Sequence, residues 1–241
     1  MTTVAPRTTL GSPSRDYSGQ LANIYLFQGM TAESLRTLST RLRPLNYRQG
    51  TIVFGKDDPG QTCFLILEGL IKIYVTSEDG QEVVLSILKS GEVVGELSLL
   101  DGVPRSASAI AMETSRVLAL NRNDFLDFVR ETPEAAMAVL SVLSGRLRHA
   151  DATITDAAFL DLPTRVAKKL LELGEDFGTK VGPVIEISIK LRQQDFAAMV
   201  SATRESVNRS LSALEEEGII KVDRQKITLL KPHLLRERVE Y

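Results

Sequence analysis

The stretch from Gly91 to Ala107 has the sequence GEVVGELSLLDGVPRSA and carries more information about function than any other part of the chain. It leaves a strand, turns at Gly95, begins a short helix and returns through a strand that starts with Arg105-Ser106. Backbone N–H groups at a helix N-terminus attract an anion, and a nearby arginine can pair with that anion in a bidentate manner. A carboxylate at Glu96 can accept hydrogen bonds from a sugar hydroxyl. Together these groups suit a phosphate that is joined to a ribose.

Two other interpretations of this stretch stay open on residue chemistry alone. The same groups also suit other anionic ligands. Alternatively, Glu96 and Arg105 form a simple structural ion pair.

The residues around this stretch predict a β-roll. From Leu45 to Leu120 short apolar runs recur with spacings of about ten residues, and glycine occupies the turns between them. The pair Asp79-Gly80 is typical of a hairpin turn between two of these runs. We therefore expect an α+β protein whose N-terminal domain is a β-roll of the double-stranded β-helix or jelly-roll type. The apolar runs include Cys63–Leu67, Leu70–Val75, Val83–Leu88 and Ser115–Leu120.

The N-terminal end of the chain has a different composition. Residues 1–19 are rich in Thr, Ser, Pro and Arg and lack apolar periodicity, so we expect a disordered tail. A short helix is expected over Thr31–Arg41, with Thr31 as its N-cap and with Leu35 and Leu38 facing inward.

A long helix is expected after the β-rich region. A short helix over Asp124–Arg130 ends near Pro133, and apolar residues then recur at alternating steps of three and four. This spacing is typical of a two-stranded coiled-coil seam, so we expect a dimerisation helix. The alternative is an amphipathic helix that packs on its own domain. The seam residues are Leu140, Leu143, Leu147, Ala150, Ile154 and Ala157.

The C-terminal region predicts a winged helix-turn-helix. Asp161 and Thr203 are suitable N-caps, glycine ends the helices that they begin, and the turn Ser201-Ala202 separates two helices of suitable length. The expected elements are a helix from Asp161 to Gly174 or Gly178, a strand Val184–Ile189, helices Gln193–Val200 and Thr203–Gly218, and a wing of Ile219–Val222 and Ile227–Leu230.

The outward face of the second of these helices carries groups that can read base edges. Arg204 and Arg209 can each donate two hydrogen bonds to guanine O6 and N7, and Glu205 can accept from cytosine N4. Short polar or cationic residues nearby are placed to hold phosphates. The alternative is an ordinary helical hairpin with a charged, solvated face. The expected DNA-binding residues are Lys190, Arg192, Thr203, Arg204, Glu205, Ser206, Asn208 and Arg209.

Composition argues against several classes of function. The single cysteine, Cys63, excludes an internal disulfide and a multi-cysteine metal site, and we expect it to be a buried strand residue. The histidines His149 and His233 have no metal-ligand spacing, so no metal site is expected. No apolar run approaches the roughly 18 residues of a membrane span, and no signal peptide is visible, so we expect a cytoplasmic protein. Catalytic motifs such as a Walker loop are absent, so no enzyme is expected.

The segment Gly95-Glu96-Leu97, a short helix and then Arg105-Ser106-Ala107 resembles the phosphate-binding cassette of cyclic-nucleotide-binding domains. With the long helix and the winged helix, the chain from near Ala22 onward resembles the family of the cyclic-AMP receptor protein and the fumarate–nitrate regulator. It is more similar to the cyclic-AMP receptor branch, whose recognition helix has an Arg-Glu-x-x-x-Arg pattern. Arg204, Glu205 and Arg209 match that pattern, and Phe159-Leu160-Asp161 resembles the hinge.

The resemblance implies a role for each residue of the cassette. Arg105 and Ser106 are implied to bind the cyclic phosphate, and Glu96 the ribose 2′-hydroxyl. Arg146 lies where the family has an arginine on the dimerisation helix near the pocket. The implied ligand-binding residues are Gly95, Glu96, Leu97, Ser98, Arg105, Ser106, Ala107, Arg146 and Asp151.

Two positions depart from the family pattern. Cyclic-AMP binders often have Thr-Ser or Thr-Asn where this chain has Ala150-Asp151, so the hydroxyl that meets the adenine amino group is missing. Asp151 either accepts from an exocyclic amine or discourages the ligand through its charge. The tight turn of the helix-turn-helix often has Gly where this chain has Ser201, which puts slight strain on the turn.

We therefore expect a homodimeric transcription regulator that binds a palindromic DNA site under the control of a cyclic nucleotide. Cyclic AMP is the first candidate, while cyclic GMP or no ligand stay open. The expected partners are double-stranded DNA, a second copy of the chain and RNA polymerase, with no membrane. The alternatives are a ligand-independent regulator and a cyclic-nucleotide-regulated signalling module without DNA contact. The expected domains are a tail (1–19), a β-roll (20–133), a dimerisation helix with hinge (134–160) and a winged helix-turn-helix (161–241).

Overall fold

The computed structural model describes residues 16–240, and the contacts within the chain divide it into two compact units. The first unit comprises residues up to Thr76 together with Val84–Leu147. The second comprises Ser77–Val83 together with the residues from Arg148 onward. The division thus falls inside a helix, whereas the sequence favours a boundary at Asp161. No helix among residues 16–240 is both long and apolar enough to cross a bilayer.

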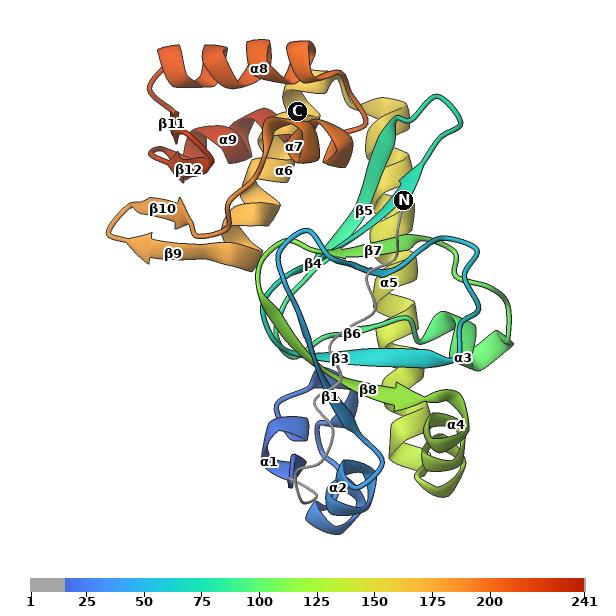
Figure 1. Ribbon diagram of the computed structural model, residues 1–241. Coiled ribbons are helices and arrows are strands. Elements are labelled where there is room, and N and C mark those ends of the chain that lie inside the picture. The colour runs from blue at the N-terminus through green and yellow to red at the C-terminus, as the bar shows by residue number, and fades with distance from the viewer. Residues whose placement is uncertain (1–15, 241) are drawn as a thin grey trace. The chain divides into compact units, whose positions relative to one another are not determined.

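The first unit is a β-roll built from two four-stranded sheets (Figure 1). One sheet has the strand order β1-β8-β3-β6, and the other has the order β2-β7-β4-β5. The expected hairpin at Asp79-Gly80 joins β4 to β5, where the N–H of Ser77 donates to the carbonyl of Gln81 at 2.9 Å. The strands are β1 (Arg43–Tyr47), β2 (Ile52–Phe54), β3 (Thr62–Glu68), β4 (Ile71–Thr76), β5 (Glu82–Leu88), β6 (Val93–Val94), β7 (Ser108–Ala111) and β8 (Ser115–Asn121).

Strand β3 is apolar along most of its length because it contributes to two cores. Phe64 and Ile66 point into the cluster between the two sheets. Cys63 and Leu65 alternate with them and point to a second cluster, where helices cover the other face. Cys63 is fully buried as expected, and burial raises the pKa of its thiol, so it is not a reactive thiolate. The helices of this unit are α1 (Ser18–Leu21), the 3-10 turn η1 (Tyr25–Phe27), α2 (Ala32–Ser39), α3 (Leu97–Asp101), α4 (Arg122–Glu131) and the beginning of α5 (Pro133–Phe159).

The end of the segment expected as a tail is ordered. Residues 1–15 lie outside the described range, but Tyr17 is buried and Ser18 begins α1. The N–H of Tyr17 donates to Ser39 Oγ at 2.7 Å. Burial of one aromatic ring offsets the entropy of ordering this short segment, which the polar composition does not reveal. Helix α2 begins as predicted, with Thr31 Oγ1 accepting from the N–H of Ser34 at 3.2 Å.

The second unit contains the predicted winged helix-turn-helix. Its first helix begins where Asp161 Oδ1 accepts from the N–H of Thr164 at 2.9 Å. It ends at Gly178, where the backbone becomes extended, and this position requires glycine because a Cβ there would lie 2.1 Å from the carbonyl oxygen of Gly174. The sheet has the order β11-β12-β10-β9. The elements are α6 (Leu162–Phe177), β9 (Gly178–Val181), β10 (Val184–Ile187), α7 (Gln193–Met199), α8 (Arg204–Glu216), β11 (Ile220–Asp223), β12 (Lys226–Leu229) and α9 (Pro232–Val239).

Candidate ligand site and nucleic-acid interface

Arg105 is a buried cation of the first unit, with only 4% of its surface exposed. Its Nη1 donates to the carbonyl oxygen of Gly95 at 2.6 Å, and its Nη2 donates to the carbonyl oxygen of Thr62. The guanidinium carbon lies 4.3 Å from the centre of the Phe54 ring, in a cation–π contact. Burial lowers the pKa of Arg105, and its charge is stabilised by these carbonyl dipoles and by the aromatic face.

The loop between β2 and β3 frames this arginine through its backbone. The N–H of Arg105 donates to the carbonyl of Asp58 at 2.9 Å, and the N–H of Asp57 donates to the carbonyl of Arg105 at 2.8 Å. Gly60 packs so closely on α3 that a Cβ there would lie 2.0 Å from Ser98 Cβ. The sequence indicates only a turn at Gly60, so its contact with the cassette is a structural finding.

Gly95 needs to be glycine for two reasons. Its φ is +86°, in the left-handed region that side chains disfavour, and a Cβ there would lie 2.5 Å from Arg105 Nη1. The turn predicted at Gly95 is therefore also the backbone surface on which the Arg105 guanidinium packs.

Glu96 is 2% exposed and pairs with the long helix. Its Oε1 accepts from Arg146 Nη1, while Arg146 Nη2 donates to the carbonyl oxygen of Val93 at 2.6 Å. The partner of Glu96 is therefore Arg146, and the geometry does not support a simple Glu96–Arg105 ion pair. Burial raises the pKa of Glu96, and the charge of Arg146 opposes that shift.

Two polar atoms of the cassette are buried without a hydrogen-bond partner in the structure: Glu96 Oε2 and Arg105 Nε. A buried polar group left unpaired costs about 1–3 kcal/mol, so such atoms point to a ligand. A guanidinium carries five N–H groups, so the bonds to Gly95 and Thr62 leave donors for an oxyanion, while Oε2 can accept from a hydroxyl. The residues fit the phosphate and ribose of a cyclic nucleotide.

The other expected ligand residues are placed unevenly around this centre. Ser98 and Ala107 are buried, whereas Leu97 and Ser106 are exposed. Asp151 is exposed on the part of α5 that belongs to the second unit, as is its neighbour Ala150. Within the first unit, therefore, the structure brings together the cassette and Arg146 but not Asp151.

Helix α8 presents the expected recognition face. Val207, Leu211 and Leu214 are buried on its inner side. Arg204, Glu205 and Arg209 are exposed on the other side, and Lys190 and Arg192 are exposed on the segment before α7. The hydroxyl of Thr203 is used as the helix cap, where it accepts from the N–H of Ser206 at 3.3 Å.

Gln193 is a residue of this surface that the sequence did not single out. Its Oε1 accepts from Arg204 Nε at 3.1 Å and from Asn208 Nδ2 at 3.3 Å. Arg209 is held within its own helix, since its Nη2 donates to Ser206 Oγ at 3.1 Å. The turn before α8 has Ser201 at a φ of +50°, in agreement with the strain expected where the family often has glycine.

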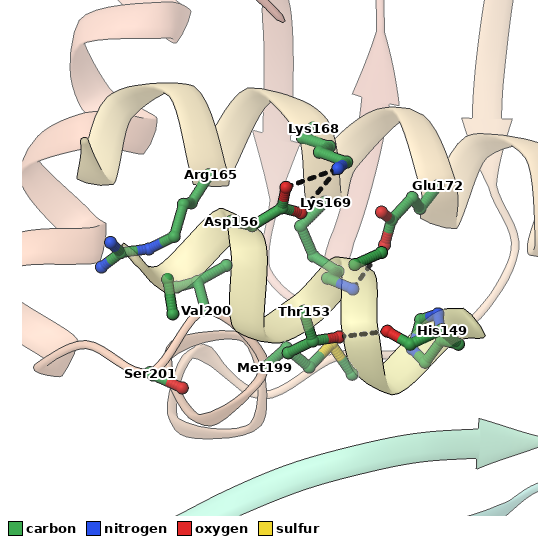
Figure 2. Close-up of a pocket in the computed structure, with 12 residues that line it drawn as sticks. His149, Thr153, Asp156, Arg165, Lys168, Lys169, Glu172, Met199, Val200 and Ser201 are labelled. Carbon is green, nitrogen blue, oxygen red and sulfur yellow. Dashed lines mark hydrogen bonds and ion pairs between the residues drawn. The ribbon is translucent and has the colours of Figure 1, made fainter. Parts of the chain in front are cut away.

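A hollow lies within the second unit, between α5, α6 and the turn before α8 (Figure 2). Lys168 pairs with Asp156 at 2.6 Å, and Lys169 pairs with Glu172. Arg165 Nη1 donates to the carbonyl of Leu160 at 3.0 Å. The basic side chains Arg165, Lys168 and Lys169 of this hollow thus have partners within the unit, and the Lys168–Asp156 pair joins α6 to α5.

A β-roll with a buried arginine cassette, joined in one chain to a winged helix-turn-helix, defines a transcription regulator with a ligand-binding domain. The family of cyclic nucleotide-binding domains matches residues 44–132, and the Crp-like helix-turn-helix domain matches residues 164–238. The chain belongs to the Crp/Fnr family of transcription regulators, so it is not an enzyme.

Relatives of this chain span almost its whole length. The "CRP-like cAMP-activated global transcriptional regulator" of Mycobacterium tuberculosis is 32% identical over 90% of this chain and 97% of its own length. The "Cyclic AMP receptor protein" of Thermus thermophilus is 35% identical over 88% of this chain and 95% of its own length. The crystal structure of a CRP/FNR-family regulator from Thermus thermophilus has a TM-score of 0.70 at 27% identity, and covers 83% of this chain and 99% of that one.

Proposed function

We propose that this protein is a cytoplasmic homodimer that binds a palindromic DNA site and responds to cyclic AMP. In this account residues 20–133 bind the ligand, residues 134–160 form the dimerisation helix and hinge, and residues 161–241 bind DNA. Ligand binding shifts a pre-existing equilibrium toward the DNA-competent arrangement of the dimer. RNA polymerase would be a further partner of the DNA-bound dimer.

The observation that supports the ligand is the pair of unpartnered buried atoms in the cassette. Arg105, with Ser106, would hold the cyclic phosphate through N–H groups that Gly95 and Thr62 do not use. Glu96 Oε2 would accept from the ribose 2′-hydroxyl while Oε1 stays with Arg146. Gly95, Leu97, Ser98 and Ala107 would line the site. The cyclic nucleotide would neutralise Arg105 and pair the orphaned atoms, which favours the bound form.

The choice of cyclic AMP over other cyclic nucleotides is supported by the relatives. The names of the Mycobacterium tuberculosis and Thermus thermophilus proteins both specify cyclic AMP. Where cyclic-AMP binders of the family have a residue that faces the base, this chain has Ala150-Asp151. The carboxylate of Asp151 would either accept from an exocyclic amine, which adenine and guanine both carry, or discourage the ligand through its charge.

The dimer is supported by apolar residues that α5 leaves exposed. Leu140, Leu147 and Ile154 have 55%, 63% and 68% of their surfaces exposed, and they lie on the predicted seam. A regular stripe of large exposed apolar side chains is costly in water and is typical of a surface that another protein covers. A second copy of the same helix would cover it.

DNA binding by the dimer follows from the exposed face of α8. Two such helices would enter successive major grooves about 34 Å apart, with Arg204 and Arg209 at base edges. The resemblance to the cyclic-AMP receptor branch suggests half-sites similar to TGTGA.

The test is a gel shift of the full-length protein with a duplex that carries two inverted TGTGA half-sites, with and without cyclic AMP. We expect a shifted band that strengthens with cyclic AMP. Absence of a shift with such palindromes in both conditions would contradict the proposal.

A second candidate is the same DNA-binding regulator without a ligand. It is favoured by Ala150 and by the partners that Arg105 and Glu96 already have within the chain. Calorimetry distinguishes the two candidates, because micromolar or tighter binding of cyclic AMP removes the ligand-independent version.

A further inference from the structure

Gln193 joins the two helices of the helix-turn-helix through a single side-chain oxygen. It is the first residue of α7, and its Oε1 accepts from both Arg204 Nε and Asn208 Nδ2 on α8. Arg204 and Asn208 are four residues apart and therefore lie on the same face of α8. One side chain of the first helix thus fixes two side chains of the recognition face.

The direction of these hydrogen bonds is determined by the arginine. A guanidinium has donors only, so the Gln193 atom that faces Arg204 Nε has to be the oxygen. That oxygen can only accept, so Asn208 has to present its NH₂ group. This orientation turns Asn208 Oδ1 into the protein, where it is buried without a hydrogen-bond partner in the structure. Asn208 therefore takes the orientation that the hydrogen bond between Gln193 and Arg204 requires.

The contact also selects which edge of Arg204 is available. Because Nε donates to Gln193, the terminal nitrogens Nη1 and Nη2 are the pair that this geometry leaves for guanine O6 and N7. A long side chain that is held before binding loses less freedom when it forms a bidentate contact. Among residues 16–240, Arg209 is held from its own helix alone, by Ser206, so the two arginines are not equivalent.

We propose that Gln193 is a positioning residue that sets how sharply Arg204 discriminates guanine from the other bases. This inference rests on the proposed function, since it needs Arg204 to read a base. Gln193 would act through Arg204 and would carry little of the sequence-independent affinity, which comes from phosphate contacts.

The experiment measures specificity separately from affinity. Fluorescence anisotropy of the full-length protein with saturating cyclic AMP gives Kd for the inverted TGTGA palindrome and for duplexes in which each guanine is replaced symmetrically. The variant Gln193→Met keeps the length of the side chain but removes the acceptor. We expect the preference for one guanine to fall about fivefold, the lower end of what one bidentate pair supplies, with an unchanged salt dependence.

Three further variants make the result decisive. Gln194→Ala alters the exposed neighbour and should leave the preference as in wild type. Gln193→Glu restores an acceptor and should restore the preference, although overall affinity falls because a carboxylate lies near phosphates. In an Arg204→Met background, Gln193→Met should have no further effect on the preference. Thermal unfolding checks that each variant is folded.

The outcomes separate this inference from the proposed function. If wild type binds none of the palindromes, the proposed function fails. The inference is overturned if wild type prefers guanine and Gln193→Met leaves that preference intact, because Gln193 then has no role in base discrimination. It is also overturned if Gln193→Met weakens binding to all duplexes equally and lowers the salt dependence, because Gln193 is then a phosphate contact.

Discussion

The cassette and the recognition helix use the same residue type in opposite ways. Arg105 is 4% exposed and is held by two backbone carbonyls and an aromatic ring. Arg204 is exposed, and a side-chain oxygen of Gln193 holds it at 3.1 Å. The ligand site is therefore part of the core of the β-roll, whereas the DNA surface is carried on the outside of its unit. Changes to the first should affect folding and binding together, and changes to the second should affect binding alone.

Replacing each arginine by methionine tests this contrast most strongly. Arg105→Met should weaken cyclic AMP binding by about 100-fold, since it removes the partner of a buried charge. It should also lower the free energy of unfolding by about 1–3 kcal/mol, because the carbonyls of Gly95 and Thr62 lose a donor. Arg204→Met should change stability by less than about 0.5 kcal/mol and weaken operator binding about tenfold.

Calorimetry, urea unfolding and anisotropy measure these three quantities. Equal urea midpoints for the two variants would show that the cassette is not part of the folding core.

The close approach of Gly95 to Arg105 gives the next largest effect. Gly95→Ala should lower stability by about 2 kcal/mol, because a Cβ at a φ of +86° would also lie 2.5 Å from Arg105 Nη1. Gly50→Ala is the matched control, since Gly50 has a φ of +78° with no atom within 4 Å of the added Cβ. That variant should lose only about 1 kcal/mol. Similar losses in the two variants would mean that packing against Arg105 is unimportant.

Glu96 makes the free energy of unfolding depend on pH. Burial raises the pKa of Glu96 above its ordinary value of 4.5, so the folded protein keeps a proton that the unfolded chain releases. The stability from this group is full below pH 4.5 and is lost as pH rises through the raised pKa. Glu96→Gln lacks this titration, so its stability relative to wild type should rise as the pH increases from 4.5 through the raised pKa of Glu96.

Urea unfolding across this pH range measures the difference, without ligand. When Glu96 is present, Arg146→Met should make the loss of stability with rising pH larger, because the charge of Arg146 opposes the rise in the pKa of Glu96. If the free energies of unfolding of wild type and Glu96→Gln change with pH in parallel, burial does not raise the pKa of Glu96.

The smallest effect is expected at the turn before α8. Ser201→Gly should raise stability by about 0.5–1 kcal/mol, because glycine tolerates the φ of +50°. The neighbouring Ala202→Gly, at a position without a positive φ, should lower stability by a similar amount. Differential scanning calorimetry measures both, and a loss of stability in Ser201→Gly would show that the turn is not strained.

The sequence predicted the elements that depend on local chemistry. Thr31, Asp161 and Thr203 each cap a helix because the bond they make reaches only three residues ahead. The alternation in β3 and the periodicity of α5 likewise depend on neighbours along the chain. The sequence therefore located both the cassette and the recognition helix.

The contacts that complete the two sites were not predictable in this way. Thr62 meets Arg105 from 43 residues away through a carbonyl, which every residue type carries. In the sequence, Phe54 looks like an ordinary core residue and Gly60 looks like an ordinary turn residue, so neither signals a contact with the cassette. Gln193 meets Asn208 from 15 residues away, on another helix. These contacts depend on how strands and helices pack against one another, and the periodicity of residues along the sequence does not reveal that packing.

The coupling between the two sites is the central claim, and an operator-binding titration tests it directly. The full-length wild type and Arg105→Met are titrated onto a labelled TGTGA palindrome at increasing cyclic AMP, at a temperature where both are folded. We expect cyclic AMP to raise the operator affinity of wild type and to leave that of Arg105→Met unchanged. An operator affinity in wild type that does not respond to cyclic AMP, or an equal response in Arg105→Met, would contradict the account.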